Sequence, residues 1–255
     1  MDISNGNAQI ADTLARALDL KGPPIAVCFG AEVAAELPDF KDRVPAGCAF
    51  WERAFKGGFS TTARDHENCA IGTFTHGMAA SSAAHESERA TALATFAELG
   101  YVRPDDIPQI PRMDRQIEIV SYLPLAAARH RPDVVLIFAN SQQGLIMTEA
   151  AQQLDQGAPP ALGRPACAIV PQVFRTGRAA LSLGCCGARA YLDVLRDDVA
   201  LWALPGHRLE EYATRIAELS QANRVLSRFH ALRRKDIEAG GTPSVAESLA
   251  RLDAE

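Results

Sequence analysis

The chain has 255 residues, 47% of them hydrophobic, which is enough for one large domain or two closely packed ones. Its formal net charge of -5 argues against a general nucleic-acid-binding surface and against a polyanionic membrane partner. The N-terminus lacks a basic region followed by an apolar core, and no uninterrupted apolar run reaches the roughly 18 residues of a membrane-spanning helix. We therefore expect a cytoplasmic protein that binds neither nucleic acid nor a membrane.

Helical and strand-like patterns alternate in the N-terminal part of the chain. Apolar residues at helical spacing predict a helix over 10–18, and the apolar run 25–29 predicts a buried strand. The segment 48–57 has a helical pattern, and a brief strand is expected over 59–62. An amphipathic helix is predicted over 87–99, where a glycine follows as its stop.

A proline-rich connection over 103–111 separates this part from the rest. Asn140 or Ser141 can cap a helix that extends to Leu154. We expect the last long element, 209–237, to be an amphipathic helix that packs on the core or on a second subunit, as in a homodimer. The remaining patterns predict strands over 116–123, 133–138, 179–184 and 198–204 and a helix over 188–196.

These elements predict an α/β or α+β fold, with a mixed sheet, helices and two pseudo-repeated halves that a long C-terminal helix closes. The predicted boundaries are 1–102 for the first half, 103–206 for the second half and 207–255 for the C-terminal helical segment. Neither a Gly-x-Gly-x-x-Gly fingerprint after a strand nor a Walker-type Gly-Lys-Ser/Thr is present, so a nucleotide-binding fold would lack its phosphate-binding loop.

The internal repeat is suggested by residues 48–58 and 167–177. Aligned on cysteine, both begin with Cys-Ala and an apolar residue, and both have Phe seven places later, followed by a basic residue and then glycine. Pro171 lies inside the second segment, so we expect less helix there than in the first. A second cysteine follows each segment, Cys69 in the first half and Cys185 in the second. The alternative is a chance resemblance between two apolar segments.

Six cysteines in a reducing compartment favour metal binding or thiol chemistry over disulfides, although some are expected to be buried core residues, as we interpret Cys28. No Cys-x-x-Cys pair, the usual spacing of zinc ribbons and many iron–sulfur proteins, is present. The long-range pattern instead singles out Cys48, Cys69, Cys167 and Cys185.

If these cysteines converge from four separate segments, the favoured cofactor is a [4Fe-4S] cluster, because a cluster offers several iron corners to widely separated thiolates. Three thiolate ligands would leave one iron open to bind substrate as a Lewis acid, whereas four would favour electron transfer or a structural role.

Residues that could transfer protons lie close to Cys69. His66 and Glu67 precede it and His76 follows it, and each could be a general acid or base, although a single histidine is more often structural. A rival interpretation makes Cys69 a nucleophile beside His66, but no signature of a catalytic cysteine is matched.

Two arginines could hold a carboxylate through a bidentate contact. Arg189 follows Cys185 by one helical turn, and Arg64 precedes Cys69 by a few residues. Ordinary surface ion pairs are the alternative for both. Together with His66 and Glu67, Arg189 completes the set of candidate catalytic residues.

Several of these motifs recur together in one known family. Residues 44–51, 65–77 and 182–189, with the shorter segments 23–27 and 204–206, resemble the prokaryotic family catalogued as domain of unknown function number 169. The resemblance covers nearly the whole chain. It implies that the Gly-Cys, Asn-Cys and Gly-Cys segments are recurring features, which favours the four cysteines singled out above over Cys28 and Cys186. It implies no established reaction.

Our first functional hypothesis is an enzyme of the lyase or desulfidase type, which uses an open-iron [4Fe-4S] cluster on a small anionic or sulfur-containing substrate. The second is a non-enzymatic iron–sulfur or metal-binding module, such as a sensor, carrier or electron-transfer partner. The third is a metal-free protein with buried thiols and an unrelated pocket.

Overall fold

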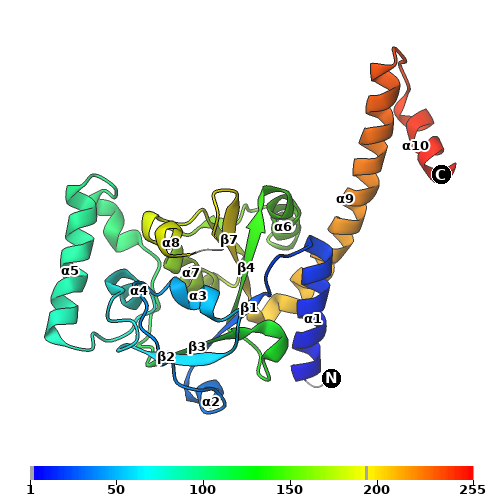
Figure 1. Ribbon diagram of the computed structural model, residues 1–255. Coiled ribbons are helices and arrows are strands. Elements are labelled where there is room, and N and C mark those ends of the chain that lie inside the picture. Colours follow the sequence, from blue (N-terminus) through cyan, green and yellow to red (C-terminus); the bar gives the residue numbers. More distant parts are fainter. Residues whose placement is uncertain (1–2, 193–194, 255) are drawn as a thin grey trace.

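A seven-stranded sheet forms the centre of the protein, in the order β2-β3-β1-β4-β7-β6-β5 (Figure 1). The computed structural model describes residues 3–192 and 195–254. Neighbouring strands are antiparallel except for the short parallel pair of β5 and β6. The strands are β1 (Ile25–Phe29), β2 (Phe59–Thr62), β3 (Ile119–Pro124), β4 (Val134–Asn140), β5 (Ala161–Leu162), β6 (Ala180–Ser182) and β7 (Val199–Pro205). The predicted α/β class with a mixed sheet is therefore confirmed.

Both faces of the sheet are apolar, because successive residues of a strand point to opposite sides and helices cover each side. In β4, Val134 and Leu136 belong to one buried cluster, whereas Val135 and Ile137 belong to the other. A strand that is buried on both faces is a continuous apolar run, which is why β1 and β4 can be recognised in the sequence.

One face is covered by α1 (Ile3–Leu18), α6 (Ser141–Leu154) and the first part of α9 (Leu209–Glu238). Asn140 caps α6, and a reciprocal bond from the Gln143 side chain completes a capping box. The rest of α9 projects from the body, and α10 (Val245–Ala254) folds back beside it (Figure 1). None of the described helices is long and apolar enough to cross a membrane.

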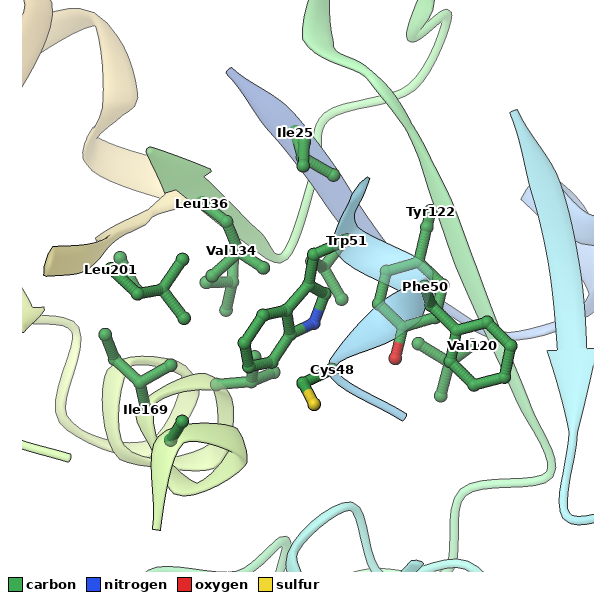
Figure 2. Close-up of a cluster of buried hydrophobic side chains, with 14 of the residues drawn as sticks. Ile25, Cys48, Phe50, Trp51, Val120, Tyr122, Val134, Leu136, Ile169 and Leu201 are labelled. Atoms are coloured by element: carbon green, nitrogen blue, oxygen red, sulfur yellow. The ribbon is translucent and has the colours of Figure 1, made fainter. Parts of the chain in front are cut away.

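The opposite face holds the short helices α3 (Ala49–Arg53), α7 (Ile169–Thr176) and α8 (Cys186–Tyr191). Figure 2 shows Phe50 and Trp51 of α3 lying over the sheet, next to Tyr122 of β3 and Val134 of β4. Beyond the sheet, α4 (Ala70–Thr75) and α5 (Ala83–Glu98) extend this layer (Figure 1). Short helical turns complete the chain: α2 (Ala31–Ala34), η1 (Pro104–Gln109), η2 (Leu125–Ala127), η3 (Ala166–Ala168) and η4 (Gly206–Arg208).

The strands form two sets around the antiparallel central pair of β1 and β4. In each set the chain passes from the central strand to an outer strand and returns between them, through β1, β2 and β3 and then through β4, β6 and β7. This topology is compatible with the internal repeat, which stays a prediction. The boundary between the two sets of strands lies after β3, so one strand of the predicted second half, 103–206, belongs to the first set. All seven strands form one sheet.

The second cysteine segment is more helical than Pro171 led us to predict. Pro171 occupies the first turn of α7, where its missing N–H group has no intrahelical acceptor to lose. The helix predicted over 188–196 begins earlier, and α8 ends at Tyr191, while positions 193–194 lie outside the described residues. The sequence patterns missed α4, which is too short to show a helical period.

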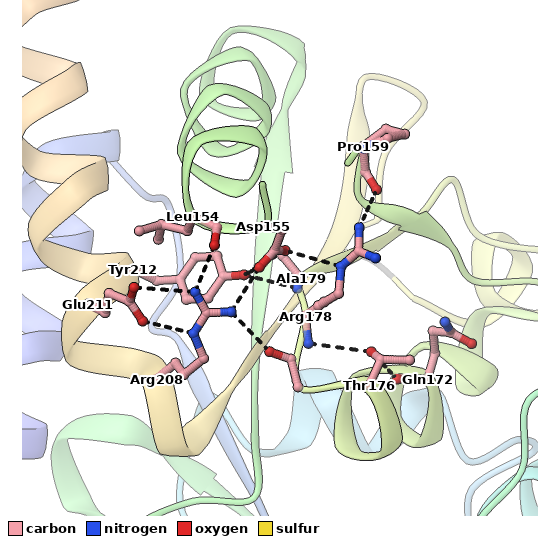
Figure 3. A network of polar contacts seen from close by, with 11 residues as sticks. Leu154, Asp155, Pro159, Gln172, Thr176, Arg178, Ala179, Arg208, Glu211 and Tyr212 are labelled. Atoms are coloured by element: carbon pink, nitrogen blue, oxygen red, sulfur yellow. Dashed lines mark hydrogen bonds and ion pairs between the residues drawn. The ribbon is translucent and has the colours of Figure 1, made fainter. Parts of the chain in front are cut away.

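A buried carboxylate joins α6, α9 and β6 on the other side of the sheet (Figure 3). Asp155, whose side chain is 1% exposed, accepts hydrogen bonds from the Tyr212 hydroxyl at 2.9 Å and from Arg208 Nη1 at 2.8 Å. The Tyr212 oxygen in turn accepts from the N–H group of Ala179 at 3.2 Å. Because every buried polar group here has a partner, the network fixes the start of α9.

Candidate functional site

A cavity of about 580 Å³ lies among the short helices on the α3 face of the sheet. Four cysteines line it, each from a different segment: Cys48, Cys69, Cys167 and Cys185. Segments that lie far apart in the sequence therefore meet at one place. Sequence spacing alone cannot establish this convergence, which is decided by the sheet that joins the segments.

Cys48 is held at the cavity by the aromatic residues of α3. It directly precedes the first residue of that helix and is 7% exposed. Phe50 stacks on Tyr122 with the ring centroids 5.7 Å apart, and Trp51 is 1% exposed among the apolar residues of the sheet (Figure 2). Burial of these two large side chains orients α3, so the position of Cys48 follows from core packing.

Cys69 is surrounded by glycine backbone. A Cβ added to Gly72 would lie 2.6 Å from Cys69 Sγ, and one added to Gly47 would lie 3.4 Å from it. The backbone N–H groups of Gly47 and Gly72 lie near enough to the Cys69 thiol to lower its pKa, although burial outweighs them. Glycine at these positions leaves room for the sulfur and lets backbone N–H groups approach it.

The other two cysteines come from the second half of the chain. Cys167 lies in η3, and its thiol points at the carbonyl oxygen of Ile71 in α4, 3.9 Å away. Cys185 precedes α8, and its sulfur accepts a hydrogen bond from the N–H group of Ala188 at 3.4 Å. The contact with Ile71 joins the second cysteine segment directly to the helix that follows Cys69.

Burial in the cavity disfavours the thiolate form of Cys48, Cys69 and Cys167. Burial, followed by repulsion from Cys69 and Cys185, raises the pKa of Cys48 to about 12. Burial also raises the pKa of Cys69, although the nearby N–H groups of Gly47 and Gly72 oppose that shift, and it raises the pKa of Cys167 well above the ordinary value. Neutral thiols are poor nucleophiles, so this arrangement disfavours the interpretation of Cys69 as a nucleophile.

His66 lies behind Cys69 and does not line the cavity, since it is 1% exposed. The Thr61 hydroxyl donates to the Val120 carbonyl at 2.8 Å, so it accepts the hydrogen of His66 Nε2 at 3.0 Å. His66 Nδ1 then carries the lone pair and has no hydrogen-bond partner among the described residues. A Cβ on Gly47 would touch both this nitrogen and Cys69 Sγ, at 3.3 and 3.4 Å.

The two other candidate catalytic residues have different surroundings. Glu67 lines the cavity, but its side chain is 46% exposed and pairs with Arg43 at 3.4 Å. Arg189 is not among the cavity-lining residues; its guanidinium donates to the carbonyl oxygens of Leu183 at 2.6 Å and Arg196 at 2.8 Å. In this geometry Arg189 holds the loop before Cys185 and leaves little capacity for a carboxylate. Arg64 is exposed and also lies outside the cavity lining.

The remaining cysteines are separate from this group. Cys28 is 2% exposed in the cluster on the α1 face, which confirms its interpretation as a core residue. The side chain of Cys186 lies outside the described part of the structure.

The sequence patterns missed the outer wall of the cavity. It consists of Leu93 and Phe96 of α5, then Tyr101, Val102 and Ile110 after that helix. The helical period of α5 indicates an apolar side, but not the element that this side faces.

The donor set limits what could bind. Among the described residues, no group of three or more His, Cys, Asp or Glu side chains is arranged to hold a metal ion. The four cysteines instead line an open volume, and one of their sulfurs, that of Cys185, accepts a hydrogen bond from the N–H group of Ala188.

Comparison with known proteins gives one match. The model of domain of unknown function 169, described as uncharacterised ArCR, matches residues 13–215. No curated protein and no solved structure matches the chain.

Proposed function

We propose a function for this chain, which belongs to the family catalogued as domain of unknown function 169: it is a cytoplasmic enzyme that binds a [4Fe-4S] cluster. The proposed ligands are Cys48, Cys69, Cys167 and Cys185. The observation that carries the proposal is that these four cysteines, from four separate segments, line one cavity on one face of the sheet.

The surroundings of the sulfurs support a cationic guest. Buried thiols that repel one another as thiolates are stabilised in the deprotonated form by bound metal, which supplies the missing positive charge. The N–H groups near Cys69 and Cys185 would hydrogen-bond the same sulfurs and tune a cluster. The cavity leaves space beyond the sulfurs, as a substrate would need.

Bound through three thiolates, a cluster supplies an open iron that polarises a substrate group as a Lewis acid. The expected reaction is of the non-redox lyase or desulfidase type on a small molecule. In that reaction the chain itself binds the substrate and excludes water, and Glu67 is the cavity-lining candidate for moving a proton.

The number of cysteines favours a second candidate function. Four cysteines rather than three line the cavity, and four ligands would occupy every iron corner. The protein would then be a non-enzymatic iron–sulfur sensor, carrier or electron-transfer module.

Anaerobic purification followed by a visible spectrum and iron and sulfide analysis tests both candidates. We expect a brown protein with about four irons per chain, the content of one [4Fe-4S] cluster. A colourless protein that takes up no iron on anaerobic reconstitution would exclude both.

Single Cys→Ser variants then count the ligands, and Cys28→Ser is the control because Cys28 is a buried cysteine on the other face of the sheet. Loss of iron at three of the four cavity positions, with the control unchanged, supports an open iron. Loss at all four supports the non-enzymatic module.

A further inference from the structure

The apolar part of the cavity lining indicates what the cavity accepts. Leu93 and Phe96 come from α5, and Val102 and Ile110 follow it in the chain. Tyr191 of α8 and Ile71 of α4 extend the same apolar lining. The space beyond the sulfurs therefore offers hydrocarbon and aromatic surface to a ligand, and burial of a matching apolar body is its main source of affinity.

The charged residues of the cavity are at its rim. Arg164 carries the sole positive charge among the described lining residues; its side chain is 54% exposed and pairs with Asp106 at 3.3 Å. Glu67 is also exposed and paired, and Glu88 is exposed. A ligand anion would meet two carboxylates and one arginine that already has a partner, so the lining does not favour an anionic body.

We infer that the substrate is a small organosulfur compound with an uncharged, apolar body. Anionic substrates, which the sequence left open, are excluded by this inference. The hydrocarbon part of the substrate lies against α5 and the apolar residues on either side of η1, Val102 and Ile110, and its sulfur faces the cysteines. The position of the sulfur rests on the proposed function, since a soft iron site prefers sulfur. The prediction that the body of the substrate is apolar rests on the cavity lining alone.

The first test uses metal-free protein and 1-alkanols from ethanol to hexanol, with affinity measured by calorimetry. Each added methylene is expected to tighten binding about fourfold, the equivalent of about 0.8 kcal/mol, until the cavity is full. Leu93→Asn should weaken hexanol binding about tenfold or more, whereas Leu99→Asn should not, because Leu99 is 75% exposed and does not line the cavity.

A second variant, which fills part of the cavity with a larger side chain, tests whether weaker hexanol binding in Leu93→Asn is caused by misfolding. Ala92 also lines the cavity, so Ala92→Phe should exclude hexanol while ethanol still binds. Affinity that is independent of chain length, or equal losses in Leu93→Asn and Leu99→Asn, would overturn the prediction of an apolar body whether or not the protein binds iron.

The second test uses the iron-loaded protein with 1-hexanethiol, 1-hexanol and 6-mercaptohexanoate. Hexanethiol should bind at least tenfold more tightly than hexanol and shift the visible spectrum, and the anionic thiol should bind no more tightly than hexanethiol. Equal affinity for hexanethiol and hexanol would overturn the claim that the sulfur of the substrate faces the cysteines. Tighter binding of the anionic thiol would overturn the claim that the body of the substrate is uncharged. Failure to load iron would overturn both the proposed function and the predicted position of the substrate's sulfur. The alkanol series would still test whether the cavity prefers an apolar body.

Discussion

Cys69 and Gly72 are packed so closely that a Cβ on residue 72 would lie 2.6 Å from Cys69 Sγ. The only side chain that fits beside this sulfur without moving it is therefore hydrogen. The same glycine is in α4, where glycine by itself destabilises a helix relative to alanine. Its presence is explained by the sulfur, whose position it leaves undisturbed.

Gly72→Ala is expected to lower iron retention by about tenfold, because the added Cβ displaces the Cys69 sulfur, and a displaced ligand typically costs that much in metal affinity. Iron per chain after anaerobic reconstitution and gel filtration measures the effect. Gly144→Ala in α6 is the control, since its Cβ would meet Trp202 at an ordinary 3.6 Å. That variant should keep its iron and gain up to about 1 kcal/mol of stability. Equal iron in both variants would contradict the role of Gly72.

His76 should make the metal-free protein sensitive to acid. It is 2% exposed, and burial lowers its pKa to about 4. The unfolded chain binds a proton near the ordinary pKa of about 6.5, while the folded chain does not until about pH 4. The stability from neutral His76 is therefore complete above about pH 6.5 and is lost as the pH falls to 4, by about 3 kcal/mol.

Urea unfolding at pH 7 and pH 4.5 measures this loss. His76→Gln should reduce the difference between the two pH values, but not abolish it, because burial also lowers the pKa of His66. An unchanged pH dependence in the variant would show that His76 titrates in the folded state as it does in the unfolded chain.

Arg189 is expected to stabilise a loop rather than bind substrate. Arg189→Met removes the hydrogen bonds to the carbonyl oxygens of Leu183 and Arg196, and should lower the free energy of unfolding by about 1–3 kcal/mol. The affinity of the iron-loaded protein for 6-mercaptohexanoate relative to hexanethiol should stay the same. A selective loss of the carboxylate-bearing ligand would restore the carboxylate-binding role expected from the sequence.

Tyr212→Phe tests the network at the start of α9. The variant leaves the N–H group of Ala179 without its acceptor and removes one donor to Asp155, so we expect a loss of about 1–3 kcal/mol in urea unfolding. Tyr101→Phe is the matched control, because Tyr101 is 54% exposed, and it should change stability by less than about 0.5 kcal/mol. Iron content should be unaffected in Tyr212→Phe, since the network lies across the sheet from the cysteines.

Much of the secondary structure could be predicted because it is determined by local patterns. The strands β1 and β4 are continuous apolar runs, and α6 and α9 have clear starts or long helical periods. Elements without a local period could not be found this way, and α4, with six residues, is one of them. The helicity of the second cysteine segment was wrongly reduced because the effect of Pro171 depends on its position in the helix.

The sequence by itself determined which cysteines were candidates to act together, because Cys48 and Cys167 begin two similar segments and a second cysteine follows each of them. It also determined the two-sided apolar character of the central strands. Only the tertiary structure decided that Cys48, Cys69, Cys167 and Cys185 line one cavity, and that Arg189 is engaged elsewhere. The physical reason is that convergence depends on the order and direction of strands far apart in the sequence, and hydrogen-bond partners depend on the same long-range packing.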